Sequence, residues 1–72
     1  MAKDDEILKK HSVVIAGHQT SVTLENIFWT ELKKIAKKEQ KSLKALITEI
    51  DKSRTTNLSS AIRVYILIKL KN

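Results

Sequence analysis

The run from Gln19 to Leu24 alternates polar and apolar residues and then passes directly into a helical pattern. An alternation of period two is typical of a half-buried strand, in which Val22 and Leu24 face the core. The alternate residues Gln19, Ser21 and Thr23 then face outward. A single short strand has open hydrogen-bonding edges, so we expect it to pair antiparallel with the same strand of a second copy.

The residues before this strand favour a second extended segment. Val13 and Ile15 alternate with polar or smaller neighbours, and Gly17 is a turn or bulge residue between strands predicted at about 11–16 and 19–24. Whether the earlier strand pairs within its own chain or extends the ribbon of a dimer stays open. Residues 1–10 are mostly charged and lack periodicity, so we expect a flexible arm before a single domain over 11–72.

After Leu24 the apolar spacing changes to that of helices. Phe28, Leu32, Ile35 and Ala36 form one stripe and predict a helix over about 25–39. Ser42 suits the N-cap of a helix over about 42–51, and Asn57 or a nearby threonine suits the N-cap of one over about 58–70. The sequence therefore predicts a mainly α fold with a short β-ribbon.

The last predicted helix is apolar on most of its circumference, which indicates that a partner chain covers it. A chain of 72 residues without cysteine has neither disulfides nor cysteine-based zinc sites to stabilise it. Oligomerisation is the stabilising device that is left. We expect these side chains to form a dimer core: Val22, Leu24, Phe28, Trp29, Leu32, Ile35, Leu46, Ile50, Ile62, Tyr65 and Ile66.

The chain carries a net charge of +6 and has a pI near 9.8, which favours a polyanionic partner. A lysine-rich surface is also common in small soluble proteins, so charge alone does not decide the partner. The charged N-terminus lacks the apolar centre of a signal peptide. The most apolar run, residues 61–70, contains Arg63 and Lys69 and is about half of a membrane span. We expect a cytoplasmic protein that does not enter a membrane.

The residues from Ser12 to Asp51, and a later segment that begins at Asn57, resemble a bacterial ribbon-helix-helix subfamily. In that subfamily a Gly-His-x-Thr-Ser motif precedes the strand, an aromatic pair opens the first helix, and Asn-Leu-Ser-Ser-Ala-x-Arg begins the last. The matching residues are Gly17, His18, Thr20, Ser21, Phe28, Trp29, Asn57, Leu58, Ser59, Ser60, Ala61 and Arg63. The resemblance implies an intertwined homodimer that binds double-stranded DNA, with an additional C-terminal helix.

The resemblance also implies which residues contact DNA. The outward strand positions Gln19, Ser21 and Thr23 would contact base edges in the major groove, without the arginine or lysine that most often binds guanine. The start of the second helix would bind a phosphate through its free N–H groups. Its residues are Lys41, Ser42, Leu43 and Lys44.

A second alignment leaves the position of the phosphate site open. The segment 55–65 also resembles the second helix of simpler family members, which moves the site to Arg54, Asn57 and Ser59 and makes 42–51 an insertion. We prefer the earlier helix, because a link of about two to five residues is usual between the two helices.

No constellation for catalysis stands out in the sequence. His11 and His18 lack nearby carboxylate or thiol clusters and are poor metal ligands, and no nucleophile lies beside a base. We therefore expect no enzymatic activity, cofactor, metal or small-molecule substrate. The leading hypothesis is a homodimeric transcriptional repressor. The alternatives are a protein-interaction or antitoxin-like dimerisation module whose apolar C-terminal helix docks a partner protein, and a nonspecific architectural DNA binder.

Overall fold

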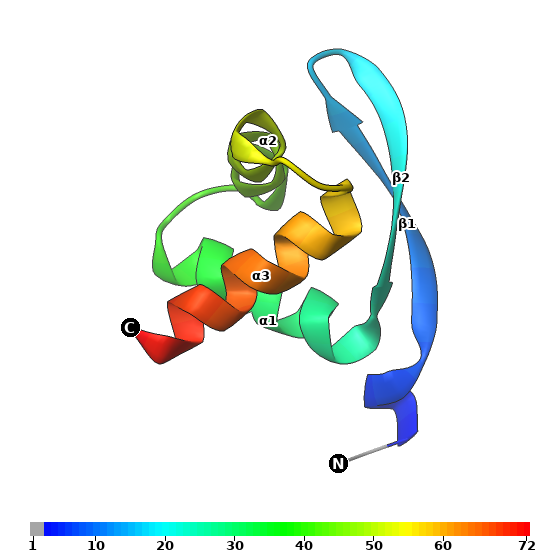
Figure 1. The fold of residues 1–72 in the computed structure, drawn as a ribbon, viewed down its shortest axis with the longest axis vertical. Helices are drawn as coiled ribbons and strands as arrows, with labels where there is room; N and C mark the ends of the chain where they lie inside the picture. Colours follow the sequence, from blue (N-terminus) through cyan, green and yellow to red (C-terminus); the bar gives the residue numbers. More distant parts are fainter. Residues whose placement is uncertain (1–2) are drawn as a thin grey trace.

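The computed structural model describes residues 3–72, which form a two-stranded antiparallel sheet followed by three α-helices (Figure 1). A short 3-10 helix, η1, precedes the sheet. The elements in chain order are η1 (Lys3–Glu6), β1 (Leu8–Ile15), β2 (His18–Glu25), α1 (Asn26–Lys38), α2 (Leu43–Ser53) and α3 (Leu58–Lys71). The prediction of a mainly α fold with a β-ribbon and an additional C-terminal helix is confirmed.

The ribbon is a hairpin within one chain. β1 pairs with β2 in register from Leu8 opposite Glu25 to Ile15 opposite His18. A two-residue turn joins the strands, and both Ala16 (φ 51°) and Gly17 (φ 79°) are left-handed, as in the turns that match the twist of a hairpin. Our expectation that the strand needs a second copy for pairing is therefore wrong, because β1 supplies the partner strand.

The predicted flexible arm is partly ordered, since it contains η1 and the first three residues of β1. The side-chain Nδ2 of Asn26 donates to the carbonyl of Asp4 at 2.8 Å, and its backbone N–H donates to the carbonyl of Ile7 at 2.9 Å. Charge did not prevent pairing at Lys9 and Lys10, because lysine heads stay in solvent while their backbone groups enter the ladder. Residues 1–2 of the predicted arm lie outside the described residues.

A core of apolar residues lies between the ribbon and the three helices. The buried set is Ile15, Val22, Leu24, Leu32, Ile35, Ala36, Leu46, Ile47, Ile50, Leu58, Ile62 and Ile66. Phe28, Trp29 and Tyr65 are partly buried against it. All of the residues that we expected in a dimer core thus pack within one chain, because β1 completes the sheet and α3 covers the other two helices.

Two of the helices begin at the caps that the sequence predicted. The Ser42 Oγ accepts a hydrogen bond from the N–H of Ala45 at 3.0 Å, and the Asn57 Oδ1 accepts one from the N–H of Ser60 at 2.9 Å. Glu25 stands at the N-cap of α1 without a capping hydrogen bond from its side chain. Within residues 3–72, none of the helices has the length and apolarity to cross a membrane.

Candidate nucleic-acid interface

The outer face of the ribbon is polar and exposed. Directly opposed residues of an antiparallel pair share a face, and the register places Thr23 beside Lys10, Ser21 beside Ser12 and Gln19 beside Val14. All six side chains are exposed. The three residues that the sequence predicted to face outward do so, and together with their partners on β1 they form a continuous surface that we call the ribbon face.

Lys10 gives the ribbon face a cation that sequence reasoning missed. We had assigned residues 1–10 to an arm, although the alternation of Lys10, Ser12 and Val14 continues the strand pattern backward. Among residues 3–72, Lys10 makes no ion pair. Its ammonium group is therefore available to a ligand of the ribbon.

An aromatic pair supports the ribbon from its inner face. The rings of His11 and Trp29 are stacked with centroids 3.8 Å apart and an angle of 6° between their planes. Burial lowers the pKa of His11 from its ordinary value of 6.5, and the positive charges of Lys9 and Lys33 lower it further. The His11 Nε2 is buried without a hydrogen-bond partner. A neutral imidazole therefore packs on Trp29, which links β1 to α1.

The start of α2 lies beside β1. A hollow of about 290 Å³ separates the two elements, and its lining residues are Ser12, Val13, Val14, Trp29, Leu43, Lys44 and Ile47. Lys44 is exposed and makes no ion pair within the described part of the chain. The first N–H groups of α2 and one free ammonium group thus lie next to the strand that carries half of the ribbon face.

Lys41, which we expected to contact a phosphate, forms ion pairs within its own chain. Its Nζ lies 2.8 Å from a carboxylate oxygen of Glu49 and 3.5 Å from one of Glu39. The hydrogen bond to Glu49 raises the pKa of Lys41, and the second carboxylate adds to the effect. The ammonium group of Lys41 is therefore neutralised within its own chain, which leaves Lys44 as the free lysine at the start of α2.

The alternative phosphate site at the start of α3 is built from groups that are already bonded. The Arg54 Nε donates to the Asp51 carboxylate at 2.7 Å, and its Nη1 donates to the carbonyl of Thr56 at 2.8 Å. Ser59 is partly buried. The guanidinium group would have to leave these partners before it could bind a phosphate.

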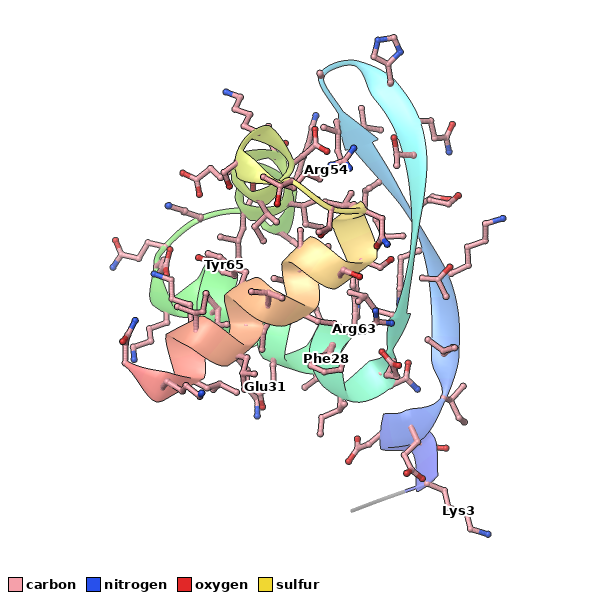
Figure 2. All side chains as sticks on the ribbon, viewed as in Figure 1. Lys3, Phe28, Glu31, Arg54, Arg63 and Tyr65 are labelled. Atoms are coloured by element: carbon pink, nitrogen blue, oxygen red, sulfur yellow. The ribbon has the colours of Figure 1, made fainter. Side chains whose placement is uncertain are left out.

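An ion pair fixes the ribbon to α3. The Arg63 Nε donates to the Glu25 Oε1 at 3.0 Å, and the guanidinium carbon lies 5.8 Å from the centre of the Phe28 ring (Figure 2). The backbone N–H of Glu25 lowers the pKa of its own carboxyl group, and the hydrogen bond from Arg63 lowers it further. This ion pair holds the end of β2 against α3, which helps to fix the orientation of the ribbon relative to the helices.

The residues show little that would hold a metal ion. Over residues 3–72, histidine, aspartate and glutamate side chains form no group of three or more with metal-binding geometry. The polar groups of the surface are instead hydrogen-bond donors and acceptors on a ribbon, with free lysines beside it.

A polar two-stranded ribbon followed by a helix, a short turn and a capped helix defines a ribbon-helix-helix architecture. The ribbon-helix-helix domain model matches residues 8–70, and the chain belongs to this family. Among solved structures, an uncharacterized protein from Bordetella pertussis Tohama I is similar, with a TM-score of 0.80 and 26% identity over 93% of this chain. The chain spans 58% of the length of that protein. No curated protein matches the chain.

Proposed function

We propose that this protein is a homodimeric, non-enzymatic transcriptional regulator that binds double-stranded DNA with the ribbon face in the major groove. The observation that carries the proposal is the position of the α2 N-terminus and Lys44 beside the strand that bears Ser12 and Val14. A groove-binding surface and a phosphate-binding surface thus lie next to each other. Membership of the ribbon-helix-helix family supports the same class of function.

The ribbon face has the size and chemistry for a major groove. Two strands lie about 4.8 Å apart, and the groove is about 12 Å wide, so a two-stranded ribbon enters where a wider sheet does not. Gln19 suits a bidentate contact to adenine, and Lys10 suits the O6 and N7 acceptors of guanine. Ser21 and Thr23 donate or accept according to the base.

The start of α2 would fix the ribbon on the DNA backbone. The first N–H groups of a helix lack partners within the helix and carry a partial positive charge, which favours a phosphate. The Ser42 Oγ caps the helix by accepting a hydrogen bond from the N–H of Ala45, and this cap does not engage the amides of Leu43 and Lys44. Two chains would carry a net charge of +12, twice the +6 of one chain, which raises nonspecific attraction to DNA.

The first experiment selects bound sequences from a random DNA pool and then measures affinity by fluorescence anisotropy while salt is varied. If a dimer neutralises about six phosphates, log K falls with log salt at a slope near −5. The triple variant Gln19→Ala, Ser21→Ala and Thr23→Ala should lose sequence preference. Thr30→Ala, which changes an exposed residue of α1, is the control. Absence of binding at about 50 mM salt would contradict the proposal.

A second pair of variants locates the phosphate contact. Lys44→Glu places a negative charge at the start of α2, and Lys52→Glu places the same charge in its last turn, near the alternative site. We expect Lys44→Glu to weaken DNA binding at least tenfold and Lys52→Glu to have the smaller effect, since a charge-assisted contact contributes about 1.5–3 kcal/mol. The reverse order would move the site to the start of α3.

A further inference from the structure

Val14 is an exposed apolar residue on the ribbon face. It lies on β1 close to the hairpin turn, and 42% of its surface is accessible. The register places it directly opposite Gln19 of β2. The other members of the ribbon face carry hydrogen-bonding side chains; they are Lys10, Ser12, Gln19, Ser21 and Thr23.

Packing within the chain does not account for an apolar side chain at this position. The neighbours of Val14 point to the inner face of the hairpin, where Ile15 is part of the core and Val13 packs against it. Val14 alternates with them and points outward. Threonine favours a strand as much as valine does and would match the polar face. The apolar group of Val14 is therefore available to a ligand of the ribbon face.

The thymine C5 methyl is the apolar group that base edges present in the major groove. A valine pressed against a G·C edge would remove water from hydrogen-bonding groups of the bases without replacing the lost bonds, which is unfavourable. Against a thymine methyl, the same side chain buries apolar surface on both partners. Val14 therefore favours thymine over the other bases.

Gln19 has the complementary preference at the neighbouring position. Directly opposed residues of an antiparallel pair have Cβ atoms about 4.5–5.5 Å apart, so the Val14 and Gln19 side chains lie side by side. The Gln19 amide suits the N6 and N7 atoms of adenine. One A·T base pair presents these two atoms on its adenine and the methyl group on its thymine.

We propose that Val14 and Gln19 together contact one A·T base pair, with Gln19 on the adenine and Val14 on the C5 methyl of the thymine. This base pair specifies the target of the proposed function, on which the inference rests. Val14 and Lys44 line the same hollow, and α2 lies near the turn end of the hairpin (Figure 1). The A·T contact and the phosphate contact proposed for Lys44 thus belong to one end of the ribbon.

The other end of the hairpin differs in its charge. Leu8 is also apolar and 55% exposed, but its partner in the register is Glu25. The Glu25 carboxylate is paired with Arg63 at 3.0 Å. A carboxylate beside Leu8 repels the phosphates of DNA, so we expect the thymine contact at the turn end alone.

Replacing thymine by uracil tests the contact, because uracil lacks only the methyl group. Each thymine of the selected DNA site is replaced in turn, and affinity is measured by fluorescence anisotropy. For the unmodified protein we expect about fourfold weaker binding at one thymine of each half-site, the effect of one buried methyl group. Val14→Ser should bind the thymine and uracil sites equally. Val64→Ser, at a 56% exposed valine of α3, is the matched control and should keep the fourfold difference.

Selection from a random DNA pool tests whether the two residues contact the same base pair. Val14→Ser and Gln19→Ala should each relax the preference for A·T at one shared position, whereas Lys10→Ala should relax a different position. Circular dichroism of each variant checks the fold. Loss of preference at two separate positions would overturn the shared contact.

The uracil experiment separates the two ways in which the inference can fail. Equal binding of the unmodified protein to every uracil site and to the thymine site would overturn the Val14 contact and leave the proposed function intact. A methyl effect that persists in Val14→Ser would assign the contact to another residue. Absence of binding to any DNA would contradict the proposed function, and the Val14 contact with it.

Discussion

The lysines of this chain differ in what surrounds their ammonium groups. Lys41 lies between two carboxylates and Lys69 against one, whereas Lys10 and Lys44 make no ion pair among residues 3–72. A paired lysine must break its ion pair before it can contact a phosphate or a base, whereas a free lysine has no ion pair to break. For the proposed DNA contact, the free lysines beside the ribbon therefore matter more than the total charge.

Neighbouring lysines on opposite faces of β1 provide a matched test of the ribbon face. We expect Lys10→Ala to weaken binding to the selected DNA site by about 1–3 kcal/mol, because a base contact is lost. Lys9→Ala removes the same charge from the inner face and should cost less. Anisotropy titrations of both variants, with the selected and a scrambled site, measure the difference. Equal losses would indicate that only nonspecific charge is involved.

His11 makes the stability of the chain sensitive to pH. Because its pKa is lowered by burial and by Lys9 and Lys33, the folded state favours the neutral ring. The resulting stability is present above the unfolded pKa of about 6.5 and is lost as pH falls toward the lower folded value. We expect the free energy of unfolding to decrease from about pH 7 to pH 5.5, measured by urea denaturation with Trp29 fluorescence.

His11→Phe retains a ring against Trp29 and removes the titrating group. In this variant the decrease between about pH 7 and pH 5.5 should disappear. The lowered pKa values of Glu25 and Glu39 place their titration at more acidic pH. An unchanged pH dependence in His11→Phe would assign the effect to another group.

At the scale of elements, the hairpin turn decides which strand β2 pairs with. Two residues join two strands of eight residues, so the partner of β2 is the segment nearest in the chain. The turn contains one non-glycine residue with a positive φ, Ala16, and a conformation of this kind costs an L-residue about 1 kcal/mol. Gly17 has open space around its Cα, so a substitution there acts through the backbone alone.

Variants of the turn should therefore change stability in opposite directions. Ala16→Asn should stabilise the chain by about 0.5–1 kcal/mol, because Asn-Gly is the preferred pair for this turn. Gly17→Ala should destabilise it by about 1 kcal/mol, because its φ of 79° is left-handed. Urea denaturation of both variants checks the signs, and a stabilising Gly17→Ala would contradict the turn geometry.

The helices are joined to one another by side chains as well as by the core. Glu39, the C-cap of α1, pairs with Lys69 of α3 at 2.9 Å. It also lies 3.5 Å from Lys41, which forms a second ion pair with Glu49 of α2. The hydrogen bond from Lys69 lowers the pKa of Glu39. Their lysine ends are exposed to solvent, so these pairs orient the helices more than they stabilise them.

At the scale of the whole molecule, one chain is compact and holds its own core. The radius of gyration is 11.8 Å, close to the value of about 11 Å for a folded chain of this length. The buried residues come from the ribbon and from each of the three α-helices. Among residues 3–72, one chain thus supplies every part of this core.

This arrangement predicts that folding does not depend on dimerisation. Dilution to about 0.1 μM should leave the chain folded by fluorescence and circular dichroism. A midpoint that falls steeply on dilution would indicate that the strands of two chains are intertwined.

The sequence by itself determined the helices, their caps and the alternation of β2, because these depend on residues a few positions apart. Ser42 and Asn57 cap the predicted helices, and Gln19, Ser21 and Thr23 face outward. Only the tertiary structure showed that β2 pairs with β1 and that the core residues pack against one another within the chain. It also showed which residues of α2 lie beside the ribbon. Pairing and burial depend on segments that meet in space, which local periodicity does not encode. For the same reason, the position of Lys10 on the ribbon face and the ion pairs of Lys41 with Glu39 and Glu49 became visible only in the structure.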